Sequence, residues 1–179
     1  ESLLASSPTS PRRRGWLEDL LACVDGERAL DVAIRLAESA PEEDELWDGA
    51  EARAREVGQA EGLARSHRRV LSGLAVRAAE GDSAVGELGE RFGRRAVDWQ
   101  EEWFQDDEAA CSLMLATVRA APEALWAFER LKLAYNAAEK WDDLFELYDL
   151  ELSRTTDNFE RIQLLDDAAQ AARDFAQDG

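Results

Sequence analysis

The sequence predicts an all-α protein built from stacked antiparallel helix hairpins, and three observations lead to this fold class. Apolar residues recur at helical spacing almost everywhere after Gly15, and no run alternates as a half-buried strand does. Hydrophobic residues make up 45% and charged residues 34% of the 179 residues, which is typical of a soluble folded protein. Short breaks separate the helical stretches, so we expect about eight or nine helices with antiparallel neighbours.

The N-terminal segment, residues 1–15, is predicted to be a flexible arm, because it is rich in Ser and Pro and carries Arg12–Arg14. It has no Met and no long apolar stretch, so it does not read as a signal peptide. We expect the chain to be cut from a longer cytoplasmic protein. Residues 16–179 are predicted to form a single α-helical repeat domain.

The first helices follow apolar stripes that are separated at Pro41, Gly58 and Gly81. Their stripes contain Leu20, Leu21, Val24, Ala29, Val32, Ala33, Leu36, Ala37, Leu46, Trp47, Ala50, Ala54, Val57, Leu63, His67, Val70, Leu71 and Leu74. The segment 81–95 is the weakest prediction of a helix, because each interior Gly costs about 1 kcal/mol relative to Ala.

The later helices are marked by acidic first turns and by Pro122. Acids at 106–108 favour the start of a helix that holds Cys111, Met114, Leu115 and Val118. Pro122 opens the next helix, and another follows from Trp141. Its apolar face is predicted to contain Leu144, Phe145, Leu147, Tyr148 and Leu152.

The segment Pro122–Asn158 resembles a tetratricopeptide repeat, a helix-turn-helix unit of about 34 residues. The residues that carry the resemblance are Phe128, Leu131, Tyr135, Trp141, Leu144, Tyr148 and Leu152, although Lys132, Glu151 and Thr156 depart from the pattern. The resemblance implies a right-handed superhelix in which the first helix of each pair lines a concave groove. It places Trp126, Glu129, Arg130, Leu133 and Asn136 on the ligand-binding face.

The acids Asp142, Asp143 and Glu146 form a DDxxE pattern, which helical magnesium-dependent enzymes use to hold diphosphate. That chemistry needs a second acidic motif and basic residues around one cavity, and Asp166–Asp167 lacks a further acid at the required spacing. His67 is the only histidine, and no GxSxG motif or phosphate-binding loop is present. We therefore interpret these acids as a solvated helix face, His67 as a packed residue, and the protein as a non-enzyme without metal or cofactor.

The net charge of −18 argues against nucleic acid as a partner, because an acidic chain repels phosphate. Basic residues in Arg65–Arg69 are interpreted as an ion-paired solvent face. Cys23 and Cys111 are expected to be buried free thiols. Three aromatic residues, Trp99, Trp103 and Phe104, are predicted to pack in the core, or alternatively to form a secondary docking patch.

The predicted function is therefore a non-catalytic scaffold that binds a peptide or a partner helix, basic itself or with basic flanks, in a concave groove. A compact helical module that dimerises through exposed apolar surface is the alternative, and a magnesium-dependent enzyme is the third. No apolar run approaches the roughly 20 residues that span a bilayer, so membrane insertion is not expected.

Overall fold

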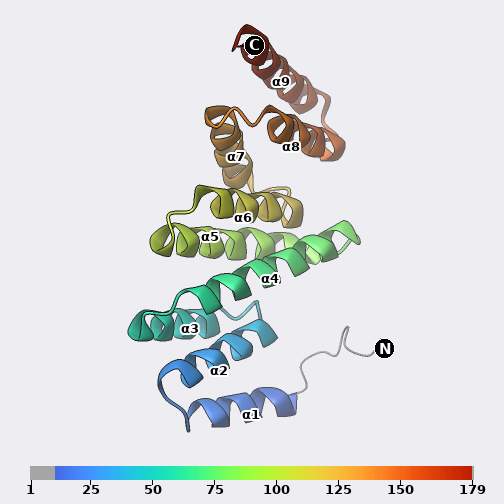
Figure 1. Cartoon of the computed structure of the whole chain (residues 1–179). Helices are drawn as coiled ribbons and strands as arrows, with labels where there is room; N and C mark the ends of the chain where they lie inside the picture. The colour runs from blue at the N-terminus through green and yellow to red at the C-terminus, as the bar shows by residue number, and fades with distance from the viewer. Residues whose placement is uncertain (1–10, 179) are drawn as a thin grey trace, which may run out of the picture. The chain divides into compact units, whose positions relative to one another are not determined.

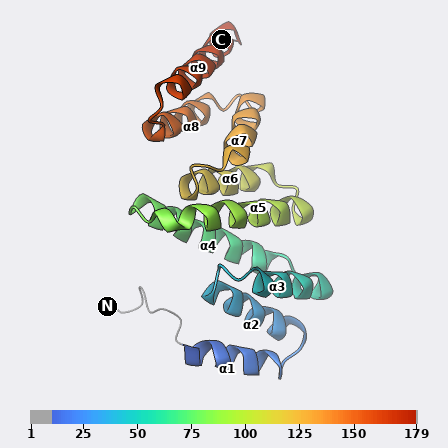
Figure 2. The same cartoon turned by 180° about the vertical axis from the view of Figure 1, so that it is seen from behind.

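The computed structural model describes the backbone of residues 11–178, and within that range it contains nine α-helices, one 3₁₀ helix and no strand (Figures 1 and 2). The α-helices are α1 (Pro11–Leu21), α2 (Gly26–Ser39), α3 (Asp44–Val57), α4 (Glu61–Ala79), α5 (Gly86–Trp103), α6 (Asp107–Ala120), α7 (Leu125–Ala137), α8 (Trp141–Arg154) and α9 (Asn158–Asp178). The 3₁₀ helix η1 spans Ser83–Val85. The prediction of an all-α protein is confirmed.

The chain divides into two compact units, Glu1–Gly73 and Leu74–Gly179, with the division inside α4. The predicted single repeat domain over residues 16–179 stays a prediction, as does the superhelical arrangement. No helix in the described range is both long and apolar enough to cross a membrane.

The first unit is built around α2, which packs against α1 on one side and α3 on the other. Leu17, Val32 and Leu36 form a buried cluster that partly buried leucines of α1 and α3 extend. Trp47 of α3 and His67 of α4 are both fully buried, with ring centroids 5.2 Å apart. The predicted packing of His67 is therefore confirmed.

Residues 11–15 of the predicted flexible arm belong to α1, which begins at Pro11. Arg14 Nη2 donates a hydrogen bond of 2.8 Å to Glu43 Oε2, and Arg14 Nε donates one of 2.9 Å to Glu18. The bond to Glu43 ties α1 to the residue that precedes α3, and this hydrogen bond from Arg14 holds the pKa of Glu43 below its ordinary value. Residues 1–10 of the predicted arm lie outside the described residues.

The second unit is a sequential stack in which α5 packs against α6, α6 against α7, α7 against α8 and α8 against α9. Side chains at two helix starts satisfy the free amide groups: Asp106 accepts from the Ala109 amide at 3.0 Å, and Asp157 accepts from the amides of Phe159 and Glu160. These caps fix where α6 and α9 begin.

The Gly-rich segment 81–95 is helical from Gly86 onward, although its interior glycines weaken the intrinsic propensity. The reason lies in the contact with α6. A Cβ atom at Gly89 would lie 2.9 Å from Ala120 Cβ, and one at Gly93 would lie 2.2 Å from Thr117 Oγ1. Only glycine at these positions allows the two helices to approach so closely.

The segment predicted to form a repeat unit is a helix-turn-helix hairpin of α7 and α8. Leu131 and Tyr135 of α7 are buried together with Leu144 and Tyr148 of α8. The predicted solvated face of α8 is confirmed as well, since its acids, Asp142, Asp143, Glu146 and Asp149, are all exposed.

Candidate functional site

Helix α7 has two different faces, and the five predicted binding residues share the outward one. Ala127, Phe128, Leu131 and Tyr135 are buried on the inward face. On the other, Glu129, Arg130, Leu133 and Asn136 are exposed and Trp126 is half-buried. Leu133 stands out, because 66% of its surface is exposed. We call these five residues the α7 ridge.

Trp126 is partly covered from within the chain. The guanidinium of Arg94 on α5 lies 4.7 Å from the centroid of the indole ring, which is a cation–π arrangement. The indole Nε1 is buried and has no hydrogen-bond partner among the described residues. Arg94 therefore covers part of the Trp126 ring, whereas Leu133 is directly accessible.

The charged members of the α7 ridge are engaged in exposed ion pairs. Lys132 Nζ lies 2.8 Å from Glu129 Oε2, and Arg130 pairs with Glu101 of α5. An exposed pair such as Arg130–Glu101 contributes about 0–1 kcal/mol, so a partner can replace it at little cost, whereas the side chain of Lys132 is only 22% exposed. A basic ligand group can therefore pair with Glu129 only if it replaces Lys132 there.

A cavity of about 510 Å³ opens on one side of the α7 ridge, between the end of α5, the start of α6 and the second half of α7. Its floor is apolar, from small side chains together with Met114 and Tyr135, and its rim is charged. The lining residues are Glu101, Asp107, Glu108, Ala110, Cys111, Met114, Arg130, Ala134, Tyr135, Ala137, Ala138 and Lys140. We call this the α6–α7 cavity.

Two hollows of about 470 and 250 Å³ lie on the other side of the ridge, where α7 faces α9, and both are lined by Asp167. We call them together the α7–α9 groove. The smaller one is lined by Leu133 and Asn136 of the ridge, and the larger one by Glu129. Four of the five residues of the α7 ridge therefore line one of these three hollows, Arg130 the α6–α7 cavity and Glu129, Leu133 and Asn136 the α7–α9 groove.

The aromatic residues near the end of α5 belong largely to the core. Trp99 is 2% exposed, so the alternative of a docking patch is wrong for this residue. Its ring lies 5.4 Å from that of Trp103, which is half-buried together with Phe104. The secondary site therefore offers two partly covered rings rather than three exposed ones.

The thiols differ from the prediction. Cys23 is exposed, so its predicted burial is wrong, because it follows the last residue of α1 rather than lying within a helix stripe. Cys111 is half-buried at the α6–α7 cavity, where burial raises the pKa of its thiol.

The basic segment Arg65–Arg69 contains an ion pair, as predicted for an ion-paired face. Arg69 Nη1 lies 2.9 Å from Glu38 Oε1.

Among the described residues, no group of three or more His, Cys, Asp or Glu side chains is placed to hold a metal ion. The three acids of the DDxxE pattern are exposed on one helix. The predicted binding residues include neither Leu125 nor any residue of α9, yet α9 lines the groove and Leu125 is 65% exposed. The apolar pattern that extends across Phe159, Ile162 and Leu165 was the signal available for α9.

Comparisons with known proteins give no relative: no family model matches the chain, and neither a curated protein nor a solved structure does. The resemblance to tetratricopeptide repeats therefore stays a prediction that rests on the residues of α7 and α8.

Proposed function

We propose that the protein is a non-catalytic scaffold that binds a peptide or a partner helix along the α7 ridge. The observation that carries this proposal is Leu133, a large apolar side chain that is 66% exposed and lines the smaller hollow of the α7–α9 groove. Exposed apolar side chains beside concave surface, rimmed by polar groups, are typical of protein-binding sites.

The chemistry of the partner follows from charge. Residues 101–179 contain 19 acidic and 7 basic side chains, a net charge of −12. A ligand with Lys or Arg beside an apolar anchor is attracted to this surface and an acidic one is repelled. The apolar anchor of the ligand would contact Leu133 and Trp126. A basic residue beside the anchor would replace Lys132 in the ion pair with Glu129.

A second candidate function, a helical dimerisation module, is favoured by one feature of α9. Phe159, Ile162 and Leu165 are 67, 63 and 53% exposed, and their spacing of three residues gathers them on one side of the helix. A second copy of the chain, packed against this stripe, would bury it. Light scattering separates the candidates, since the module must self-associate whereas a peptide receptor can stay monomeric.

The experiment that tests the scaffold is capture of a partner by the intact chain, identification by mass spectrometry, and titration of that partner against wild type, Trp126→Ala and Leu133→Ala. We expect both variants to weaken binding by more than about 1 kcal/mol, as truncation of a central anchor does. Asp149→Ala on the exposed face of α8 is the control and should bind as wild type does. Equal affinity for all four proteins would place the binding site elsewhere.

A further inference from the structure

Two tyrosines, Tyr135 and Tyr148, are buried in the α7–α8 hairpin although their hydroxyl groups have no partner there. Tyr148 is 4% and Tyr135 7% exposed, and neither hydroxyl group makes a hydrogen bond to a described residue. Buried tyrosines normally find such a partner. Neither hydroxyl oxygen is itself a buried atom, so each group opens onto accessible surface, where a ligand can supply the missing bond.

The hydroxyl group of Tyr148 opens into the smaller hollow of the α7–α9 groove, which has a volume of about 250 Å³. Leu133, the exposed apolar residue of the α7 ridge, lines the same hollow. Tyr135 instead lines the α6–α7 cavity and a hollow between α6 and α8, and Leu133 lines neither of them. Tyr148 is therefore the buried tyrosine whose hydroxyl group a ligand on Leu133 can reach.

The ring of Tyr148 is held in place by packing. It meets Phe128 edge to face, with ring centroids 6.0 Å apart. Burial raises the pKa of the Tyr148 hydroxyl group above its ordinary value of 10.0, so the group is protonated at neutral pH and can donate a hydrogen bond. A donor fixed in this way loses little conformational entropy when a ligand binds.

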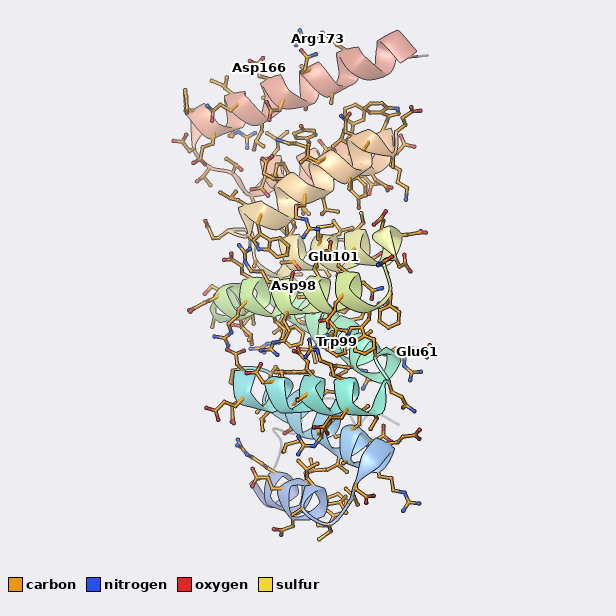
Figure 3. All side chains as sticks on the ribbon, turned by 90° about the vertical axis from the view of Figure 1, so that its left-hand side faces the viewer. Glu61, Asp98, Trp99, Glu101, Asp166 and Arg173 are labelled. Carbon is orange, nitrogen blue, oxygen red and sulfur yellow. The ribbon has the colours of Figure 1, made fainter. Side chains whose placement is uncertain are left out.

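The charged groups that line this hollow are already paired with each other. Lys132 Nζ lies 3.4 Å from Asp167 Oδ2. Asp166 and Arg173 of α9 point away from α7 and α8 (Figure 3). The other polar residues in the lining besides Tyr148 are uncharged, namely Asn136 and Gln170. The hollow therefore suits a ligand group that is polar and uncharged.

The size of the hollow narrows the choice of ligand. Pockets for small molecules usually have volumes of about 300–1,000 Å³, and this hollow is smaller. It has room for part of a longer molecule, such as one side chain and the peptide group beside it. A peptide group is polar and uncharged, and its carbonyl oxygen is a strong hydrogen-bond acceptor.

We propose that Tyr148 donates a hydrogen bond from its hydroxyl group to a main-chain carbonyl oxygen of the bound peptide, beside the apolar residue that contacts Leu133. The inference rests on the proposed function in that a peptide occupies the α7 ridge. It adds a contact that recognises the main chain of the partner, and it gives a role to a hydroxyl group that the hairpin itself does not use.

The test uses the full chain labelled with ¹³C at the Cζ atom of tyrosine, whose chemical shift responds to hydrogen bonding of the hydroxyl group. The sequence contains two tyrosines, so the spectrum has two signals, which Tyr148→Phe and Tyr135→Phe assign. The probe is N-acetyl-leucine N-methylamide, which has one apolar side chain between two peptide groups. We expect the probe to move the Tyr148 signal in a saturable way and to leave the Tyr135 signal in place.

The affinity of the probe is followed in parallel through the backbone amide of Leu133. Tyr148→Phe should weaken binding about threefold to tenfold, as the loss of one neutral hydrogen bond does. Tyr135→Phe is the matched control, because it removes a hydroxyl group from the same hairpin, and it should change the affinity less than about twofold. Both variants should unfold near the wild-type temperature, since neither hydroxyl group has a partner in the described structure.

Three results would overturn the inference. The first is equal affinity of Tyr148→Phe and wild type for the probe, or a Tyr148 signal that the probe does not move. The second is equal movement of both tyrosine signals, which would mean that the probe acts on the hairpin without a defined site. The third is movement of the Tyr148 signal by acetate or methylammonium as far as by the amide probe, because the hollow would then take a charged group.

The inference and the proposed function fail separately. If the probe leaves the Tyr148 signal in place while Leu133→Ala weakens a recovered partner, the hydrogen bond is wrong and the α7 ridge remains. If the probe moves the Tyr148 signal and Tyr148→Phe weakens its binding, yet no recovered partner depends on Leu133 or Trp126, the hollow binds peptide groups and the scaffold proposal is wrong.

Discussion

The hairpins α5–α6 and α7–α8 join neighbouring helices in opposite ways. Helix α5 approaches α6 through Gly89 and Gly93, whose missing Cβ atoms leave room for Ala120 and Thr117. The second pair is held by large side chains, among them Phe128 and Tyr148 with ring centroids 6.0 Å apart.

The difference indicates where the molecule has room for a ligand. The close contacts of Gly89 and Gly93 with α6 leave no room for a side chain at either position. Helix α7, by contrast, lines the α6–α7 cavity and both hollows of the α7–α9 groove. Under our proposal the ligand binds at α7, and the contacts of Gly89 and Gly93 hold α5 against α6.

The largest expected effect is a loss of stability from a substitution in the α7–α8 hairpin. Leu144 is 1% exposed between α7 and α8, so Leu144→Ala should lower the free energy of unfolding by about 2–5 kcal/mol. Asp142→Asn, on the exposed face of the same helix, should stay within about 0.5 kcal/mol of wild type. Denaturant titration of the two variants measures both values. The opposite ranking would show that the faces of α8 are inverted.

The next largest expected effect concerns the contact between α5 and α6. Gly93→Ala should destabilise the protein by about 1–3 kcal/mol, because the new Cβ atom would lie 2.2 Å from Thr117 Oγ1. Adding Thr117→Ala removes that oxygen and should recover part of the loss. Thermal unfolding of the single and double variants measures the coupling. A fully tolerated Gly93→Ala would mean that α5 and α6 do not approach so closely.

Binding at the α7 ridge should respond to salt as well as to substitution. Raising salt from a low to a physiological concentration should slow association with a basic partner, since charges are screened beyond about 8 Å. Association rates at the two concentrations test this for wild type. A partner whose association ignores salt would contradict the acidic surface as the attracting element.

The smallest effect is the pH dependence of Glu151. Its folded pKa is raised above the ordinary value of 4.5, so this group favours folding below that value and the contribution is lost as pH rises through the raised pKa. Glu151→Gln should therefore be slightly more stable than wild type at neutral pH, and the difference should shrink on acidification. Urea titrations at neutral and acidic pH measure it. A destabilised Glu151→Gln at neutral pH would show that the carboxylate has a partner in the folded state.

Helical periodicity in the sequence was sufficient for the fold class and for the inward face of α8, because burial of Leu144, Leu147 and Tyr148 follows directly from their spacing. It was insufficient for α5. Propensity penalises Gly89 and Gly93, and only the tertiary contact with α6 explains them.

The candidate site was predictable only in part. The resemblance to a tetratricopeptide repeat implied which side chains of α7 share one face, and Leu133 is exposed in the structure. Arg94 covers Trp126 from 32 positions away in the sequence, and Lys132 pairs with Asp167, which is 35 positions away. Local sequence patterns do not predict contacts between residues so far apart.

The central claim is that a partner contacts the outward face of α7, and photocrosslinking tests it most directly. Benzoylphenylalanine is placed at Leu133 in one protein and at Asp149, on the exposed face of α8, in another. We expect a discrete adduct with the recovered partner from position 133 only, at a segment of the partner that contains lysine or arginine. Equal adducts from both positions, or an adduct from position 149 alone, would contradict the claim.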